Sequence, residues 1–164
     1  MQRSDTLIHR HPWNVSAEGA RAVQRRLAPQ VNRSNAIPDQ PTLVAGVEAS
    51  PPDARGWALG TVALLSLPDL EVVEVRRAKG KVTFPYIPSL LAFREAPCLL
   101  EALSLLSTSP DFVLVDGHGL AHPRRFGLAC HLGVLTGLPT MAVPSPSLWG
   151  RTTLRNRKGE HTHL

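Results

Sequence analysis

Carboxylates at the ends of two apolar segments are the residues of this sequence best suited to chemistry. Glu48 stands near the end of LVAGVEAS, and Asp116 ends DFVLVD, with a glycine after it. A buried carboxylate costs several kcal/mol unless hydrogen bonds, a cationic partner or a metal ion compensate it. If the two segments are neighbouring strands that run in the same sense, both carboxylates meet at one edge of the sheet, where they can bind Mg²⁺.

Glu95, in the segment between those strands, can complete the group. Three carboxylates repel one another, so a divalent ion is a natural compensation. Two such ions about 4 Å apart can activate water and stabilise the leaving oxygen in phosphodiester hydrolysis. Other interpretations stay open: Glu48 can pair with an arginine, Glu95 can lie on a helix surface, and Asp116 can form a turn or a cap.

One aromatic residue and one histidine need separate interpretation. Tyr86 stands between two prolines in KVTFPYIPS. Prolines stiffen the backbone, so the ring can be held out as a wedge against a base, where stacking contributes roughly 1 to 3 kcal/mol. Packing of Tyr86 on the edge of the core is the equal alternative. His131 lies in an apolar helical segment, which favours a core histidine over a metal ligand.

Several elements must position these residues. Periodicity predicts an amphipathic helix over residues 15–31, a central strand buried on both faces at 43–50, and a hairpin of strands 57–66 and 70–77. A helix over 89–107, which Pro97 should start, kink or divide, leads to a strand at 111–117. A helix at 124–137 and a strand at 138–143 follow. This strand–helix–strand alternation predicts parallel pairing in the second half.

Composition sets the outer limits. The 164 residues, 43% of them hydrophobic, predict one domain over residues 1–143, followed by a basic, irregular tail over 144–164. The net charge of +5 comes mostly from arginine and suits a polyanion such as nucleic acid. Two cysteines without ligand spacing and no signal peptide or membrane span predict a cytoplasmic protein with no membrane partner. No oligomer is predicted.

Two long motifs carry a resemblance to a known family. VTFPYIPSLLAFREAPCLLEAL and VLVDGHGLAHPRRFGLACHLGVLTGLPT resemble endonuclease V, a family of repair nucleases that act at deoxyinosine in DNA and, in some members, at inosine in RNA. The similarity covers about residues 11–143. It implies an α/β fold with a ribonuclease-H-like mixed sheet flanked by helices, in a chain from which the C-terminal elements of the family are missing.

The resemblance also implies roles for particular residues. Glu48 and Asp116 would bind Mg²⁺, with Mn²⁺ as an alternative, and Glu95 would complete the catalytic set. Tyr86 would be the wedge that separates the strands, and His122 would lie near the metal. The residues that would recognise the lesion base together with Tyr86 are Pro85, Ile87, Pro88, Leu91 and Gly117. The implied partner is DNA or RNA containing inosine, nicked on the 3′ side of that base.

The sequence departs from the family pattern at several positions. Glu48 replaces an aspartate, Ser145 replaces a lysine, and Ser89 replaces a glycine, while the family continues beyond the point where this chain ends. A longer side chain at Glu48 can shift an ion by about 1 Å, which costs about 10²-fold in rate. Two alternatives to an active nuclease therefore remain: a module that binds inosine or distorted nucleic acid without cutting it, and a truncated, inactive homologue.

Overall fold

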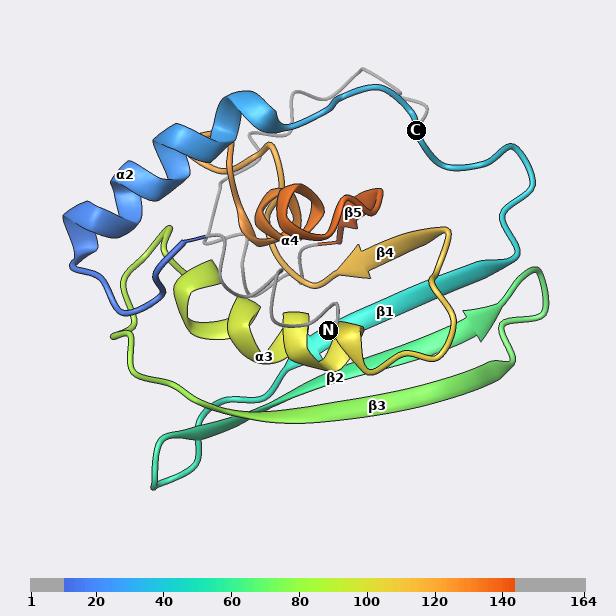
Figure 1. The fold of residues 1–164 in the computed structure, drawn as a ribbon, viewed down its shortest axis with the longest axis horizontal. Helices are drawn as coiled ribbons and strands as arrows, with labels where there is room; N and C mark the ends of the chain where they lie inside the picture. The colour runs from blue at the N-terminus through green and yellow to red at the C-terminus, as the bar shows by residue number, and fades with distance from the viewer. Residues whose placement is uncertain (1–10, 144–164) are drawn as a thin grey trace, which may run out of the picture.

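The structure, a computed structural model, describes residues 11–143 (Figure 1). Its helices are α2 (Ala17–Leu27), the short 3₁₀ helix η1 (Ala28–Gln30), α3 (Ala92–Ser104) and α4 (Leu128–Thr136). Its strands are β1 (Leu43–Ala49), β2 (Trp57–Ser66), β3 (Val72–Lys81), β4 (Phe112–Val115) and β5 (Thr140–Ala142). The predicted tail over 144–164 lies outside the described residues.

The five strands form one mixed sheet in the order β3-β2-β1-β4-β5. The β1–β2 and β2–β3 pairs are antiparallel, whereas β4 is parallel to both β1 and β5. The predicted mixed sheet is therefore confirmed, and so is the parallel pairing in the second half of the chain. β1, the strand that carries Glu48, lies at the centre.

Asp111 aligns the starts of β1 and β4. Its Oδ2 accepts hydrogen bonds from the backbone N–H groups of Thr42 at 2.7 Å and Leu43 at 3.0 Å. In return, the backbone N–H of Asp111 donates to the carbonyl of Leu43 at 2.9 Å. The hydrogen bonds that the carboxyl accepts, that from Leu43 first and then that from Thr42, lower the pKa of Asp111. Because the two strands start side by side, Val47 near the end of β1 lies next to Val115 at the end of β4.

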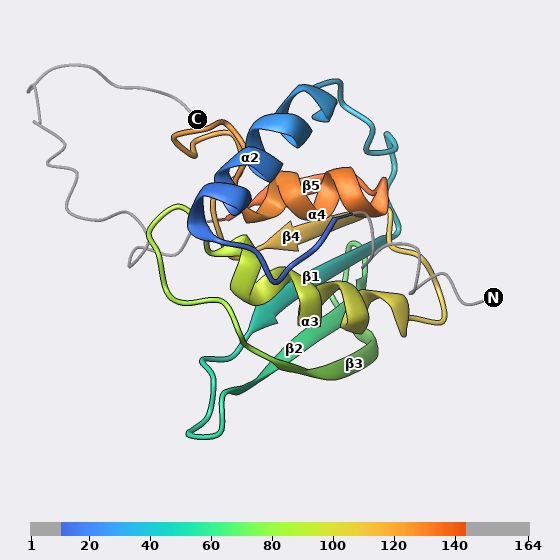
Figure 2. The ribbon, with the colours of Figure 1, turned by 60° about the vertical axis from the view of Figure 1, so that its left-hand side comes forward.

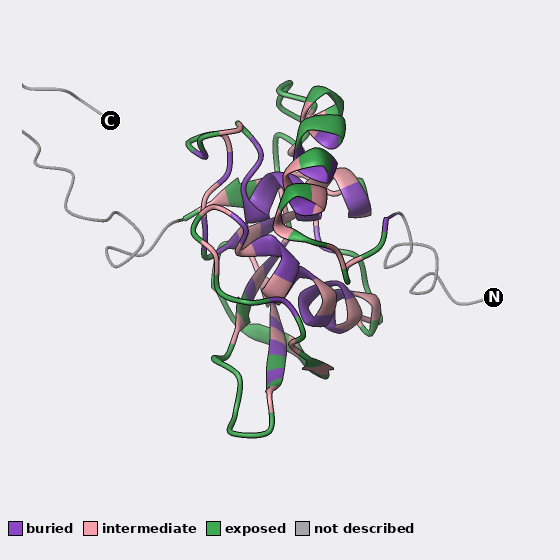
Figure 3. Cartoon of the chain, turned by 90° about the vertical axis from the view of Figure 1, so that its left-hand side faces the viewer, coloured by how far each residue is buried: buried purple, intermediate pink, exposed green. Residues whose placement is uncertain are grey.

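α3 and α4 pack on the same face of the sheet. Buried residues of β1, β2 and β4, among them Val47, Val62 and Val115, form one core cluster with Leu99 of α3 and Leu132 of α4. Figure 2 shows both helices on one side of the strands, and Figure 3 shows the buried residues gathered between these layers. In the described part of the chain no helix covers the opposite face. The prediction that β1 is buried on both faces is thus wrong at Glu48, which is exposed.

The helices differ from prediction mainly in length. α2 begins after Ser16, whose Oγ accepts a hydrogen bond from the backbone N–H of Gly19 at 3.1 Å. α3 is shorter than predicted and runs without a break through Pro97. A proline inside a helix costs about 3 kcal/mol, and burial of eight α3 residues offsets this cost. No helix among residues 11–143 is long and apolar enough to cross a membrane.

Candidate functional site

The two strand-end carboxylates lie side by side in the sheet. Val47 and Val115 are partners in the parallel pairing of β1 and β4, so the residues after them, Glu48 and Asp116, reach the same edge. Both side chains are exposed to solvent. The expectation of a buried Asp116 is therefore wrong, because β4 ends at Val115 and Asp116 lies just outside the core.

α3 brings a third carboxylate to this edge. Glu95 lies in the first turn of α3 and is half-buried. Burial first, then the negative charge of Asp116 and, to a smaller extent, that of Glu48 together raise the pKa of Glu95 to about 7. Arg94 acts in the opposite direction. The three predicted carboxylates are thus close enough to interact electrostatically.

The oxygen donors of this edge fit one mode of metal binding and not another. Within residues 11–143 no three His, Cys, Asp or Glu side chains lie in an arrangement that can hold a metal ion. Mg²⁺, however, is commonly bound by one or two carboxylates, with waters and substrate phosphates as the other ligands. Glu48 and Asp116 fit this mode, since they offer hard oxygen donors at one solvent-exposed edge next to a third negative group.

Tyr86 stands on an exposed loop formed by residues 82–91, between β3 and α3. Its side chain is 70% exposed, which excludes the alternative that it packs on the edge of the core. Arg94 supports this loop, because its Nη1 donates a hydrogen bond to the carbonyl of Phe84 at 2.8 Å. The guanidinium carbon of Arg94 lies 5.9 Å from the centre of the Tyr86 ring. We call residues 82–91 the wedge loop.

A small cavity of about 200 Å³ lies under the wedge loop. Four residues predicted to recognise a base line it: Tyr86, Ile87, Pro88 and Leu91. Pro85 and Gly117 do not line it. Pro85 is exposed on the loop. Gly117 is buried, and a Cβ placed on it would lie 3.3 Å from the side chain of Leu128, which does line the cavity.

Ser89 anchors the wedge loop from below. Its backbone has a φ of 66°, and its carbonyl accepts hydrogen bonds from Gln24 Nε2 at 3.0 Å, His122 Nε2 at 2.7 Å and Arg124 Nη2 at 3.0 Å. The same Arg124 nitrogen bonds the Ser89 hydroxyl at 2.6 Å, and Arg124 Nε donates to Gln24 Oε1 at 2.6 Å. Gln24 was not among the functional residues predicted from the sequence. The sequence feature that could have indicated it is a polar residue on the buried face of α2, next to Val23 and Leu27.

His122 belongs to this anchor. It lines the cavity and is 6% exposed, and besides the bond to Ser89 its Nδ1 accepts a hydrogen bond from the backbone N–H of Arg124 at 3.0 Å. Both ring nitrogens are therefore engaged in supporting the loops. A role near the metal stays a prediction.

His131 is a core histidine, as predicted. It is fully buried, and its Nε2 lies 2.7 Å from Nε2 of His11. Since Nδ1 of His11 donates to the carbonyl of Pro12, Nε2 of His11 accepts and Nε2 of His131 donates. Nδ1 of His131 has no hydrogen-bond partner.

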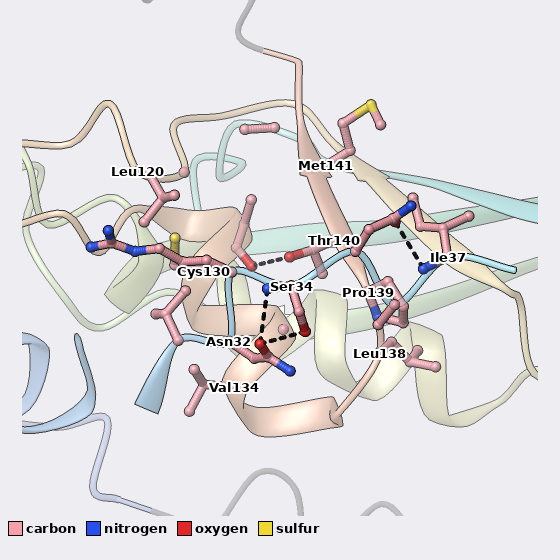
Figure 4. Close-up of a pocket in the computed structure, with 18 of the residues that line it drawn as sticks. Asn32, Ser34, Ile37, Leu120, Cys130, Val134, Leu138, Pro139, Thr140 and Met141 are labelled. Atoms are coloured by element: carbon pink, nitrogen blue, oxygen red, sulfur yellow. Dashed lines mark hydrogen bonds between the residues drawn. The ribbon is translucent and has the colours of Figure 1, made fainter. Parts of the chain in front are cut away.

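A larger cavity lies away from the carboxylates (Figure 4). It measures about 560 Å³ and is bounded by residues 30–37 on one side and by α4 and β5 on the other. Polar groups that line it form hydrogen bonds within the protein: Asn32 Oδ1 accepts from Ser34, and Thr140 Oγ1 donates to the carbonyl of Ala129. No Asp, Glu or His lines it. It therefore lacks the chemistry of the carboxylate edge.

Comparison with known proteins gives a consistent picture. A family model described as Endonuclease V matches residues 25–164. Endonuclease V of Nocardia farcinica is 48% identical over 144 residues, which are 88% of this chain and 63% of that protein. Endonuclease V of Gloeobacter violaceus is 45% identical over 90% of this chain and 60% of that protein. The chain thus spans about three fifths of the length of these relatives.

Solved structures agree with the sequence matches. Endonuclease V of Streptomyces avermitilis has a TM-score of 0.77 and 46% identity, over 81% of this chain and 59% of that chain. Endonuclease V of Ciona intestinalis, in complex with a 24mer DNA containing an inosine followed by a ribo-adenosine, has a TM-score of 0.71 and 31% identity. That match covers 76% of this chain and 56% of the Ciona chain.

Proposed function

Because this chain belongs to the endonuclease V family, we propose that it is a metal-dependent endonuclease that nicks DNA on the 3′ side of deoxyinosine, in the repair of deaminated bases. RNA containing inosine is a second substrate in this proposal. The observation that supports it best is the pairing of Val47 with Val115, which brings Glu48 and Asp116 to one edge beside Glu95. The cytoplasmic location stays a prediction.

Three carboxylates carry the proposed chemistry. Glu48 and Asp116 would hold Mg²⁺ or Mn²⁺. Glu95, half-buried beside them with a pKa of about 7, would add negative charge in its deprotonated form, which a bound cation favours. When bound, such an ion supplies Lewis acidity for the scissile phosphate and lowers the pKa of water. The protein's own contribution is to hold these groups in fixed positions, which depends on the strand register and on α3.

The wedge loop and its cavity carry the proposed recognition. Tyr86 is held out from the surface by a loop that Arg94 and Ser89 anchor, so its ring is available to stack on a base. The cavity of about 200 Å³ beneath it is small, which suits a single extruded base better than a base pair. Tyr86 would fill the gap in the stack while the base occupies the cavity.

A nicking assay tests the proposal. A duplex with one deoxyinosine is incubated with Mg²⁺, with Mn²⁺ and with chelator, and an identical duplex with adenine at that position is the substrate control. We expect metal-dependent nicking near the inosine and a loss of at least about 10²-fold in Asp116→Asn, which keeps the shape but removes the charge. Cutting that persists in chelator, or in Asp116→Asn, would reject the proposed site.

Glu48 deserves its own variants because the family has aspartate there. Glu48→Asp keeps the charge and shortens the side chain, so we expect it to retain metal-dependent nicking. Glu48→Gln keeps the length and removes the charge, so we expect it to lose nicking. If the two variants behave alike, Glu48 is not a metal ligand.

A second function has one observation in its favour. No group of three metal-binding side chains is assembled within residues 11–143, so the chain could recognise inosine without cutting. In that case folded protein would retard the inosine duplex in a gel without nicking it, and Asp116→Asn would bind as well as the unchanged chain. Ser145, where the family has a lysine, lies outside the described residues.

A further inference from the structure

β3 presents a row of cations on the face that the helices leave open. Arg77, Lys79 and Lys81 are exposed, whereas Ala78 between them is buried. Gly80 faces α3, because a Cβ placed there would lie 3.1 Å from Cβ of Cys98. Side chains alternate between the two faces of a strand, so the three cations all point away from α3. We call them the basic strip.

The basic strip begins level with the carboxylate edge. Glu48 pairs with Thr61, and Thr61 pairs with Arg77, so these side chains share the open face of the sheet. Two interstrand steps place the Cα atoms of Glu48 and Arg77 about 10 Å apart.

From there the basic strip leads to the wedge loop. Both β1 and β3 are antiparallel to β2, so β3 runs in the direction of β1 and carries Lys79 and Lys81 past the level of Glu48. The wedge loop starts directly after Lys81 (Figure 1). The basic strip is thus continuous with the element that carries Tyr86.

An aromatic ring lies within the basic strip. Trp57 pairs with Lys81 across the β2–β3 hairpin and is 37% exposed. The Nζ atoms of Lys79 and Lys81 lie 5.2 Å and 5.4 Å from the centre of its ring. Cations that track phosphates beside a ring that can stack on a base are the combination found in surfaces that bind single strands.

The neighbouring charges leave the strip positive. Asp53 is the carboxylate near the two lysines: hydrogen bonds from the backbone, that of Trp57 first, lower its pKa, and Lys79 and Lys81 add to the effect. Lys81 also donates to the carbonyl of Arg55, a further cation on this turn. Glu74 lies elsewhere, paired with Arg76 at 2.7 Å. Asp53 therefore lies near two cations of the strip, Lys79 and Lys81.

We propose that the basic strip, together with Trp57, binds the phosphate backbone of a nucleic-acid strand that extends from the carboxylate edge. Alternate residues of a strand are about 6.7 Å apart, close to the spacing of successive phosphates in an extended single strand. The contacts are with phosphate and base faces, so binding is independent of sequence and of inosine. The class of ligand rests on the proposed function, but the surface is separate from the carboxylates.

Salt-dependent binding of an undamaged strand tests the proposal. Fluorescence anisotropy of a labelled single-stranded DNA without inosine is measured in chelator at several salt concentrations. Each phosphate contact contributes about 0.7 to the slope of log affinity against log salt. For R77Q/K79Q/K81Q we expect a slope shallower by about 2 and an affinity at low salt at least about 10-fold weaker. Trp57→Leu should weaken binding without changing the slope.

The strip variant removes three positive charges from the open face. Arg76→Gln is the control, since it removes one positive charge from the opposite face of β3, at the residue before Arg77. We expect the salt slope of Arg76→Gln to match that of the unchanged chain, and thermal melting verifies that every variant is folded.

Equal affinity and slope for the strip variant and Arg76→Gln would overturn the proposal, as would a folded unchanged chain that binds no single strand. Strip-dependent binding by a chain that never nicks inosine DNA would support the strip and reject the nuclease function. Nicking of inosine DNA by a chain whose binding of the single strand does not depend on the strip would support the nuclease function and reject the strip.

Discussion

At the scale of the residue, exposure separates groups that can act on a ligand from groups that maintain the fold. Tyr86 is 70% exposed on an anchored loop, whereas His131 is fully buried. Truncation of Tyr86 removes little packing, so its effect should appear in nucleic-acid binding. Substitution of His131 changes the number of protons that the chain binds on unfolding, so its effect should appear in stability.

Tyr86→Ala should weaken binding to an inosine duplex while leaving stability almost unchanged. Loss of stacking costs roughly 1 to 3 kcal/mol, which is about 5- to 150-fold in affinity. An exposed side chain away from the core changes the free energy of unfolding by less than about 0.5 kcal/mol. Tyr86→Phe keeps the ring and serves as the control. Equal affinity of the alanine and phenylalanine variants would exclude the wedge role.

His131 should make the protein sensitive to acid. Burial first, and then the nearby His11, lowers the pKa of His131 to about 3, whereas an unfolded chain binds the proton near 6.5. Between these values the unfolded state holds one more proton than the folded state, so stability falls as pH falls. The slope should be about 1.4 kcal/mol per pH unit for this one group.

Urea unfolding at pH values between 7 and 4 measures this slope. His131→Leu removes the titrating group and should make stability depend less steeply on pH by about one proton. His11 also has a lowered pKa, again caused first by burial, so part of the slope should remain. An unchanged slope in His131→Leu would mean that His131 is not neutral in the fold.

At the scale of the element, the position of Glu95 depends on how closely α3 approaches the sheet. A Cβ on Gly60 of β2 would lie 2.4 Å from the carbonyl oxygen of Cys98 in α3. Only a residue without a side chain permits this approach. Gly46 of β1 differs, because a Cβ there meets no atom within 4 Å.

Gly60→Ala and Gly46→Ala form a matched pair. In Gly60→Ala the backbone of α3 must move, so we expect a loss of at least about 1 to 3 kcal/mol in the free energy of unfolding. In Gly46→Ala no contact opposes the methyl group, and the lower entropy of the unfolded chain should give a gain of about 0.5 to 1 kcal/mol. Thermal or urea unfolding compares them, and equal stabilities would contradict the close packing of α3 on β2.

At the scale of the whole molecule, the carboxylate edge links metal binding to stability. Glu48, Glu95 and Asp116 come from β1, from α3 and from the residue after β4, so a bound ion would connect three parts of the fold. A ligand that binds only the folded state stabilises it according to its concentration relative to Kd. This link can be measured without any nucleic acid.

Mg²⁺ should therefore raise the melting temperature. At 100 times Kd the stabilisation is about 2.7 kcal/mol, which corresponds to several degrees in a chain of this size. The rise should disappear in Asp116→Asn but persist in Glu71→Gln, which changes an exposed carboxylate near the β2–β3 turn. A rise of the same size in Asp116→Asn would place the ion elsewhere.

The sequence by itself determined what depends on local patterns. Short apolar runs and the turn between residues 66 and 70 predicted the strands, and helical spacing predicted α2, α3 and α4, because these patterns are properties of neighbouring residues. The motifs around Tyr86 and Asp116 predicted the family, the carboxylates and the wedge. Limits of elements were less well predicted, as at α3, where burial overrides the effect of Pro97.

Only the tertiary structure decided what depends on residues far apart in the chain. The pairing of Val47 with Val115 brings Glu48 and Asp116 together, and the end of β4 leaves Asp116 exposed. Gln24, Ser89 and Arg124 meet across α2 and two loops. The position of Arg77 level with Glu48, two strands away, depends on two strand registers. Such contacts depend on which surfaces pack together over the whole core, and no local pattern specifies that.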